Sequence, residues 1–202
     1  MNANRSIDFF DRQFRQQALD GYSQLNPFEQ AALPYLSGRV LDYGCGMGNL
    51  AFAAAAQGCT VLALDASPAA IAHVRRRAAA ESAPVDAVLA DLRDYALQDD
   101  FDAVVAIGLL MFFDCADAFR TLAHLQSHVR AGGIAVVNVL VEGTTYMEMF
   151  DPEHHCLFAP DELESRFAGW DILRSEASEF EAPGATVKRF ATLIARKARA
   201  ES

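Results

Sequence analysis

The sequence predicts a doubly wound α/β domain, in which helices cover both faces of a mostly parallel sheet. Short apolar segments alternate with helical segments from residue 39 to residue 141, an order typical of parallel strands joined by helices. The expected strand at 134–141 is β-branched and almost wholly apolar, as strands buried on both faces are. Two further strands, 170–177 and 186–195, flank Pro183-Gly184, and so short a connection requires antiparallel pairing. The expected sheet therefore has seven strands with an antiparallel C-terminal edge.

Length and charge limit the possible functions. The chain has 202 residues, of which 52% are apolar, and a formal net charge of -10. This composition indicates one globular domain. The acidic balance argues against a nucleic-acid partner, because phosphates require a basic face. No apolar run is long enough to span a bilayer, and the N-terminal segment carries charges where a signal peptide would be apolar. We expect no membrane partner and a cytoplasmic location, and the oligomeric state is left open.

The first elements are helical. Ile7, Phe10, Phe14 and Ala18 recur at helical spacing, which predicts an amphipathic helix over 5–18. Gly21 and Asn26-Pro27 end it, and a second short helix should reach Leu36. We divide the single domain 1–202 into an N-terminal helical cap (1–36), a ligand-binding core (37–141), and a segment with the C-terminal strands (142–202).

The core repeats one unit of strand, loop and helix. Ser67-Pro68 is a helix start, with a hydroxyl cap and proline at the first helical position, and Asp114 caps another helix that Ala131-Gly132-Gly133 ends. The expected strands are 39–42, 60–64, 85–90, 101–107 and 134–141, and the expected helices are 51–57, 67–82, 114–130 and 160–167.

A glycine loop follows the first strand, with the spacing Gly44-x-Gly46-x-Gly48. Glycines allow a tight turn and let a ligand lie against bare backbone. Asp65 ends the next strand, where its carboxylate is placed to accept hydrogen bonds from both hydroxyls of a ribose. Alone, this pattern would also fit an NAD-dependent oxidoreductase.

Three features favour a cationic nucleoside over a dinucleotide. Asn49 occupies the third glycine of the dinucleotide fingerprint, Asp42 would repel a pyrophosphate, and Asp91 closes the third strand, where an adenine amino group would lie. Three carboxylates at successive strand ends suit S-adenosylmethionine, which carries a sulfonium and an ammonium group.

At these residues the chain resembles class I S-adenosylmethionine-dependent methyltransferases. The matching pieces are Asp42-x-Gly44-x-Gly46-x-Gly48, Asp65, Asp91-Leu92, Phe101-Asp102-x-Val104-Val105 and Arg130-Ala131-Gly132-Gly133. Leu110-Met111-Phe112-Phe113 and the stretch 189–197 are similar to the tellurite-resistance methyltransferases, although the His-Arg segment of that family is missing from 179–186.

The resemblance implies a Rossmann-like sheet and a methyltransferase that takes S-adenosyl-L-methionine and releases S-adenosyl-L-homocysteine. Met111 is interpreted either as a cofactor contact or as ordinary core. The cofactor-binding residues implied are Asp42, Gly44, Cys45, Gly46, Gly48, Asn49, Asp65, Ala66, Asp91, Leu92, Ile107, Gly108 and Met111.

Two segments can reach a small-molecule acceptor beside that cofactor. One is the N-terminal helix with Phe9, Phe10, Phe14 and Tyr22. The other is the stretch 142–158, in which Tyr146, His154 and His155 are the catalytic candidates, because histidines titrate near neutral pH. Adjacent histidines do not close on one ion, so we expect no metal. A non-catalytic cofactor-binding protein remains the alternative to an enzyme.

The four cysteines are Cys45, Cys59, Cys115 and Cys156, and no two form a C-x-x-C pair. Their spacing resembles neither a disulfide framework nor a zinc site. We therefore expect four reduced thiols.

Overall fold

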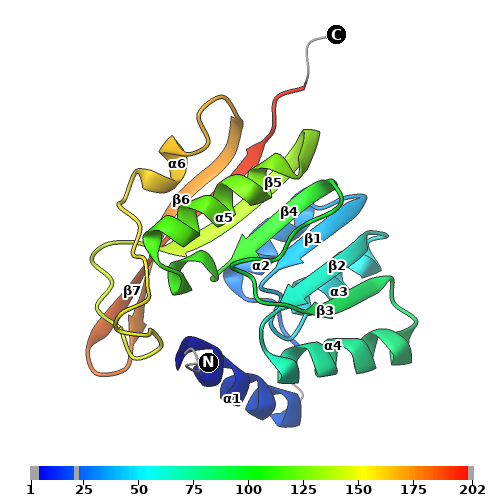
Figure 1. Ribbon diagram of the computed structural model, residues 1–202, viewed down its shortest axis with the longest axis horizontal. Helices are drawn as coiled ribbons and strands as arrows, with labels where there is room; N and C mark the ends of the chain where they lie inside the picture. The colour runs from blue at the N-terminus through cyan, green and yellow to red at the C-terminus, as the bar shows by residue number, and fades with distance from the viewer. Residues whose placement is uncertain (1–4, 21–22, 200–202) are drawn as a thin grey trace.

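A seven-stranded sheet forms the centre of the molecule (Figure 1). The structure is a computed structural model that describes residues 5–20 and 23–199, with the side chains of 18–20 excluded. The strand order is β3-β2-β1-β4-β5-β7-β6, and the sheet is parallel except at its C-terminal strands, which confirms the expected doubly wound sheet with an antiparallel edge. The strands are β1 (Arg39–Tyr43), β2 (Thr60–Asp65), β3 (Val85–Leu89), β4 (Phe101–Ile107), β5 (Val129–Leu140), β6 (Asp171–Ala182) and β7 (Thr186–Arg196).

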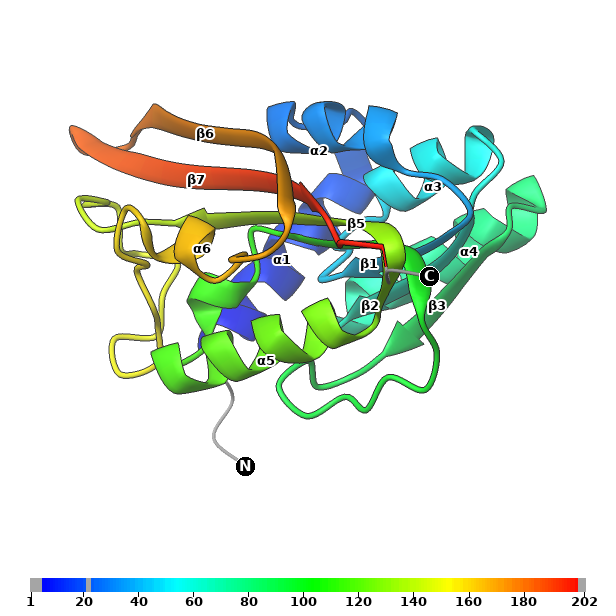
Figure 2. The same cartoon turned by 90° about the horizontal axis from the view of Figure 1, so that it is seen from above.

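Helices cover both faces of this sheet (Figure 2). On one face α2 (Pro27–Ala32), α3 (Asn49–Ala56) and α4 (Pro68–Glu81) pack on Val40, Val61 and Val105. On the other face α5 (Cys115–Ser127) and α6 (Glu162–Ser165) pack around Phe101, Phe158 and Phe167. The remaining elements are α1 (Arg5–Asp20) and the 3₁₀ turns η1 (Leu33–Tyr35) and η2 (Leu110–Phe112).

The starts of α2 and α4 follow from their capping residues, whereas the Asp114 side chain makes no capping hydrogen bond at the start of α5. The Asn26 side chain accepts hydrogen bonds from the backbone N–H groups of Phe28 and Glu29, and the Glu29 carboxylate accepts one from the Asn26 N–H, which is a complete capping box. The Ser67 hydroxyl accepts from the Ala70 N–H at the start of α4. These caps fix where α2 and α4 begin, and both helices begin beside the carboxyl ends of strands.

Strand register brings the predicted acids to one edge of the sheet. In the parallel ladders Asp42 of β1 pairs with Ala63 of β2 and with Val105 of β4, and Asp65 pairs with Leu89 of β3. The carboxyl ends of β1, β2 and β4 are therefore neighbours, which is where an open α/β sheet binds its ligand.

The largest differences from the expected element boundaries are at the start of β5 and the end of β6. β5 begins at Val129, not at residue 134, because Val129 pairs with Phe101 before a bulge and the chain crosses Gly132-Gly133 without leaving the sheet. A Cβ at Gly133 would lie 2.9 Å from two backbone oxygens, so the glycine permits this close approach. β6 also runs on to Ala182, which makes the C-terminal hairpin longer than expected.

Helix α1 lies apart from the two layers, across the carboxyl ends of the strands (Figure 1). Its Asp11 Oδ1 accepts hydrogen bonds from the Ser67 hydroxyl at 2.6 Å and the Ala69 N–H at 3.1 Å. These bonds attach α1 to the beginning of α4. No helix in the part of the chain that the structure describes is long and apolar enough to cross a membrane.

Candidate active site

A cavity of about 420 Å³ opens at the carboxyl ends of β1, β2 and β4. This volume is within the range of small-molecule sites. Helix α1 forms one wall with Ser6, Ile7, Phe10, Gln13, Phe14 and Gln17, and the turn at η2 forms another with Leu109, Phe112 and Phe113. The expectation that the N-terminal helix reaches the ligand site is met by these residues. Tyr22 and the side chain of Ala18 lie outside the described part of the chain.

The glycine loop lies against this cavity, as the sequence predicts for Gly44 and Gly46. Gly46 has φ of +51°, and its N–H donates to Asp65 Oδ2 at 2.8 Å. A Cβ there would lie 3.1 Å from the Phe14 ring of α1. The glycine therefore allows both the turn and the close approach of α1.

Asp42 is the most unusual charged group in the cavity. It is 6% exposed, and its Oδ2 has no hydrogen-bond partner within the described structure. Burial, together with repulsion from Glu29 and Asp65, raises the pKa of Asp42 to about 8. A buried carboxyl with a free oxygen is costly unless a ligand satisfies it. A ligand carrying a cation or an N–H group fits this position.

Asp65 is buried but well supported. Its Oδ1 accepts from the Ser67 N–H and its Oδ2 from the Gly46 N–H, both at 2.8 Å. Burial raises the pKa of Asp65, and these backbone hydrogen bonds oppose the rise. Each carboxylate oxygen keeps a second lone pair, so the group is fixed in place and still able to accept hydroxyl donors from the cavity.

Asp91 and Arg93 form an ion pair at the cavity rim. The Arg93 guanidinium donates to both carboxylate oxygens, with Nη2 to Oδ2 at 2.6 Å and Nε to Oδ1 at 3.0 Å. The hydrogen bonds from Arg93 hold the pKa of Asp91 below its usual value. Arg93 is thus neutralised by its neighbour and is not a free cation for an anionic ligand.

Comparisons with known proteins agree with this geometry. Residues 40–133 match the family described as "Methyltransferase domain". The probable S-adenosyl-L-methionine-dependent methyltransferase TehB of Haemophilus influenzae is 24% identical over 197 residues, 94% of this chain and 66% of that protein. The crystal structure of TehB superposes with a TM-score of 0.76 at 21% identity, covering 90% of this chain and 65% of that one. The chain has the class I methyltransferase fold and resembles TehB.

Two other proteins are similar to this chain. Hemagglutinin 1 of Eikenella corrodens is 31% identical over 168 residues, 79% of this chain and 54% of that protein. A Burkholderia thailandensis 1,6-didemethyltoxoflavin-N1-methyltransferase, crystallised with 1,6-didemethyltoxoflavin and S-adenosylhomocysteine, has a TM-score of 0.68 at 19% identity and covers 98% of this chain and 92% of that one. The chain thus spans 54% to 66% of the two sequence relatives described here.

Most residues implied by the methyltransferase resemblance do line the cavity, and two do not. Gly48 caps α3, and a Cβ there would lie 2.9 Å from Val74 Cγ2, so its role is packing against α4. Met111 is 1% exposed in a core cluster with Phe150, which agrees with the core interpretation. The lining residues from the expected set are Asp42, Gly44, Cys45, Gly46, Asn49, Asp65, Ala66, Asp91, Leu92, Ile107 and Gly108.

The three catalytic candidates are not among the residues that line the cavity, so their expected role stays a prediction that the cavity geometry does not support. The Tyr146 hydroxyl faces Glu148, and the Lys188 ammonium lies 4.5 Å from the centre of the Tyr146 ring. His154 contacts the Asp114 carboxylate at 3.2 Å, and His155 contacts the Asp151 carbonyl oxygen at 3.2 Å. The segment 142–158 runs behind η2, so η2 separates these side chains from the glycine loop.

Glu29 and Arg93 are cavity residues that the sequence-based interpretation missed. The signal for Glu29 was present, because Asn26-x-x-Glu29 is a capping-box pattern that fixes the start of α2, ahead of η1 and β1. No comparable local signal marks Arg93, whose position depends on the turn after β3.

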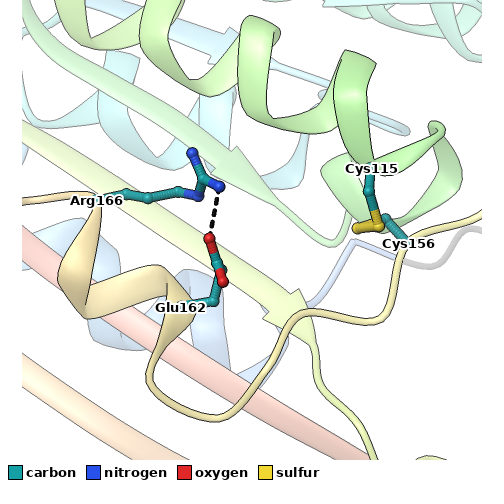
Figure 3. The surroundings of a disulfide bond; sticks show 4 residues. All are labelled: Cys115, Cys156, Glu162 and Arg166. Carbon is teal, nitrogen blue, oxygen red and sulfur yellow. Dashed lines mark ion pairs between the residues drawn. A yellow bond between two sulfur atoms is a disulfide. The ribbon is translucent and has the colours of Figure 1, made fainter.

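The cysteine prediction is wrong for one pair. Cys115 and Cys156 form a disulfide with their Cα atoms 4.8 Å apart (Figure 3). Cys45 and Cys59 are free and buried. Sequence spacing did not reveal the pair because the chain between the two cysteines forms α5 and β5 before it returns to the start of α5. Among the described residues, no group of three His, Cys, Asp or Glu side chains is arranged to hold a metal ion.

Proposed function

We propose that the protein is an S-adenosylmethionine-dependent methyltransferase that acts on a small-molecule acceptor. The observation that carries this proposal is the buried Asp42 carboxyl, whose Oδ2 has no partner beside the glycine loop. An ammonium group at this point would supply both the missing hydrogen bond and the missing charge. A dinucleotide would place a pyrophosphate beside Asp42, which would leave the carboxyl without a cationic partner and would repel its ionised form.

The remaining cavity groups fit the rest of such a cofactor. Asp65 is fixed by two backbone N–H groups and would accept the ribose hydroxyls, while the backbone at Gly44 and Gly46 leaves room for the nucleoside. Asp91 at the rim would accept from the adenine amino group. When bound, the cofactor supplies a methyl group already activated on sulfur, so the protein has to position and enclose the reactants.

Two walls of this cavity would serve the transfer itself. Helix α1 with Phe10 and Phe14, and η2 with Phe112 and Phe113, form an aromatic boundary that excludes water. Exclusion of water strengthens electrostatic contacts inside, and alignment of the acceptor behind the methyl group gives an in-line displacement. We therefore propose that these residues orient the acceptor relative to the methyl group of the cofactor.

The lining also favours one kind of acceptor. No His, Lys or Tyr side chain lines the cavity within the described residues, and its titratable groups are Glu29, Asp42, Cys45, Asp65, Asp91 and Arg93. Four carboxyl groups and a paired arginine disfavour an oxyanion. We propose an uncharged acceptor whose lone pair attacks the methyl group without prior loss of a proton, so that no strong general base is needed.

Three further proposals come from the sequence. The chain acts as one domain with the divisions given above, it works in the cytoplasm, and it uses no nucleic-acid partner. The alternative of a non-catalytic S-adenosylmethionine-binding protein is favoured by the same absence of a base among the described cavity residues.

Calorimetry with purified protein tests the proposal. S-adenosylmethionine and S-adenosylhomocysteine should bind, and NAD should not. Asp65→Ala should weaken binding at least about 10-fold, because loss of hydrogen bonds to a charged group costs roughly 1.5–3 kcal/mol. Asp99→Ala is the matched control, since Asp99 pairs with Arg39 on the surface. Tight NAD binding, or unchanged affinity in Asp65→Ala, would contradict the assignment.

Turnover separates the enzyme from the binding protein. Wild-type protein is incubated with S-adenosylmethionine and a panel of thiol, amine, hydroxyl and chalcogen oxyanion acceptors, and S-adenosylhomocysteine is quantified. Methylation of an uncharged acceptor is expected. Binding without turnover of any acceptor would favour the non-catalytic alternative.

A further inference from the structure

The Cys115–Cys156 disulfide lies outside the cavity but directly behind its η2 wall. Cys115 begins α5, two residues after the cavity-lining Phe113, and Cys156 lies near the end of the segment 142–158 (Figure 3). The Cys156 N–H also donates to the Met111 carbonyl oxygen of η2 at 2.9 Å. The disulfide and this hydrogen bond therefore fasten the segment to the wall.

The same segment is fastened at its other end to β7. The N–H groups of Thr145 and Tyr146 both donate to the Val187 carbonyl oxygen, and the Thr145 hydroxyl accepts from the Val187 N–H. Residues 147–155 thus form a span between two attachment points, one on β7 and one at the disulfide. Loss of the disulfide would leave hydrogen bonds and side-chain packing to hold the second point.

This span supports helix α1. The Asp151 N–H donates to the Ser6 hydroxyl of α1 at 3.3 Å. The Phe150 ring lies 5.1 Å from Phe112, which lies 4.9 Å from Phe10 of α1. Phe150 is 1% exposed, so its side chain is buried in these contacts. A continuous set of contacts runs from the span through η2 to the helix that closes the cavity.

The disulfide is also reachable from solvent on one side. Cys156 is buried, but Cys115 is exposed at the first turn of α5. The disulfides that do form in a reducing compartment are usually transient, and they are formed and reduced again in redox sensing or catalysis. A reductant can therefore approach the disulfide from the side of the exposed residue Cys115.

We propose that the Cys115–Cys156 disulfide is a redox-controlled clamp on helix α1, opened by a dithiol. The reductant dithiol attacks one sulfur, a mixed disulfide forms, and its second thiol releases the protein as two thiols. Two electrons and two protons pass to Cys115 and Cys156, and the dithiol becomes a disulfide. Opening frees residues 147–155 and loosens α1. The effect on ligand binding rests on the proposed function, because α1 covers the proposed cofactor.

The test compares the two redox states of the full chain. Protein purified in air is divided, and one half is treated with dithiothreitol before calorimetry with S-adenosylhomocysteine. We call a molecule closed when α1 covers the cavity. If reduction lowers the closed fraction from nearly all molecules to about a fifth, the apparent affinity for S-adenosylhomocysteine falls about 5-fold. Cys156→Ser and Cys115→Ser should each show the weak affinity and no response to dithiothreitol. Cys59→Ala, which changes a buried free thiol, should respond as the wild type does.

Hydrogen exchange of the α1 amides gives a readout that does not need the ligand. Exchange in residues 5–17 should be faster in the reduced wild type and in both serine variants, while strands β1 and β4 remain protected. Equal exchange in both redox states, or four free thiols by mass spectrometry in air-purified protein, would overturn the clamp. Absence of S-adenosylhomocysteine binding in both states would overturn the proposed function instead, and exchange would still decide the clamp.

Discussion

Burial and the two neighbouring acids, Glu29 and Asp65, all raise the pKa of the Asp42 carboxyl group. The ligand-free pKa of about 8 means that the group holds a proton at neutral pH. A cationic ligand binds the ionised form, so binding must release that proton below pH 8. The residue would therefore couple cofactor affinity to pH.

We expect the affinity for S-adenosylhomocysteine to rise from pH 6 to pH 8, with a slope of at most about 10-fold per pH unit from this one proton. Asp42→Asn should bind more weakly at pH 8 and show a flatter profile. Calorimetry at pH 6, 7 and 8 measures both. Parallel profiles in the variant and the wild type would show that Asp42 is not the titrating group.

At the residue scale, the grouping of the three cavity acids was predictable from the sequence, whereas the positions of the three catalytic candidates were not. Asp42, Asp65 and Asp91 each end a strand, and the carboxyl ends of parallel strands share one edge, so their neighbourhood follows from the pattern alone. Tyr146, His154 and His155 were chosen by residue type. Their separation from the cavity depends on the path of 142–158 behind η2, which no local pattern encodes.

At the scale of elements, α1 depends on a few polar contacts. Asp11 accepts hydrogen bonds from Ser67 and Ala69 at the start of α4 and pairs with Arg15 at 2.8 Å. Burial raises the pKa of Asp11, but the hydrogen bonds from Ser67, Ala69 and Arg15 outweigh it and lower the pKa overall. Asp11 therefore stays ionised where α1 meets α4.

Asp11→Ala should loosen α1 without disturbing the sheet. We expect S-adenosylhomocysteine affinity to fall about 3- to 10-fold through a smaller closed fraction, while the midpoint of thermal unfolding moves by only about 2 °C. Asp8→Ala, on an exposed position of the same helix, is the control. A large drop in unfolding temperature would show that α1 belongs to the folding core and is not a cover.

Element boundaries were less predictable than element order. The glycines at 132 and 133 read as the end of a helix and a loop, whereas the chain enters β5 at Val129 and passes them within the strand. The decisive contact, Val129 with Phe101, joins residues far apart in sequence. Only the folded sheet contains that information.

At the scale of the whole molecule, the buried acids set the dependence of stability on pH. The raised pKa of Asp42 means that the folded, ligand-free chain keeps a proton that the unfolded chain loses above about pH 4. Burial raises the pKa values of Asp65 and Glu29 in the same sense. The free energy of unfolding should therefore decrease as pH rises from 4 toward 8.

Urea unfolding of ligand-free protein at pH 5, 6, 7 and 8 tests this dependence. The wild type should lose stability across the series, and Asp42→Asn should lose less because it has no proton to release. Burial lowers the pKa values of His73 and His124, which acts in the opposite sense below about pH 6.5. Stability that increases between pH 7 and pH 8 would therefore contradict the raised pKa of Asp42. Saturating ligand should reduce the loss, because an ammonium group would favour ionised Asp42.

The C-terminal hairpin leaves the outer side of β6 without a strand partner in the described structure. Arg174, Glu176, Glu179 and Glu181 are exposed along it, and the chain as a whole carries -10. A second copy adding its own β6 would bring acidic groups against acidic groups, which penalises edge-to-edge growth. The protein should stay dispersed at low ionic strength, and added salt should weaken that protection against fibrous association.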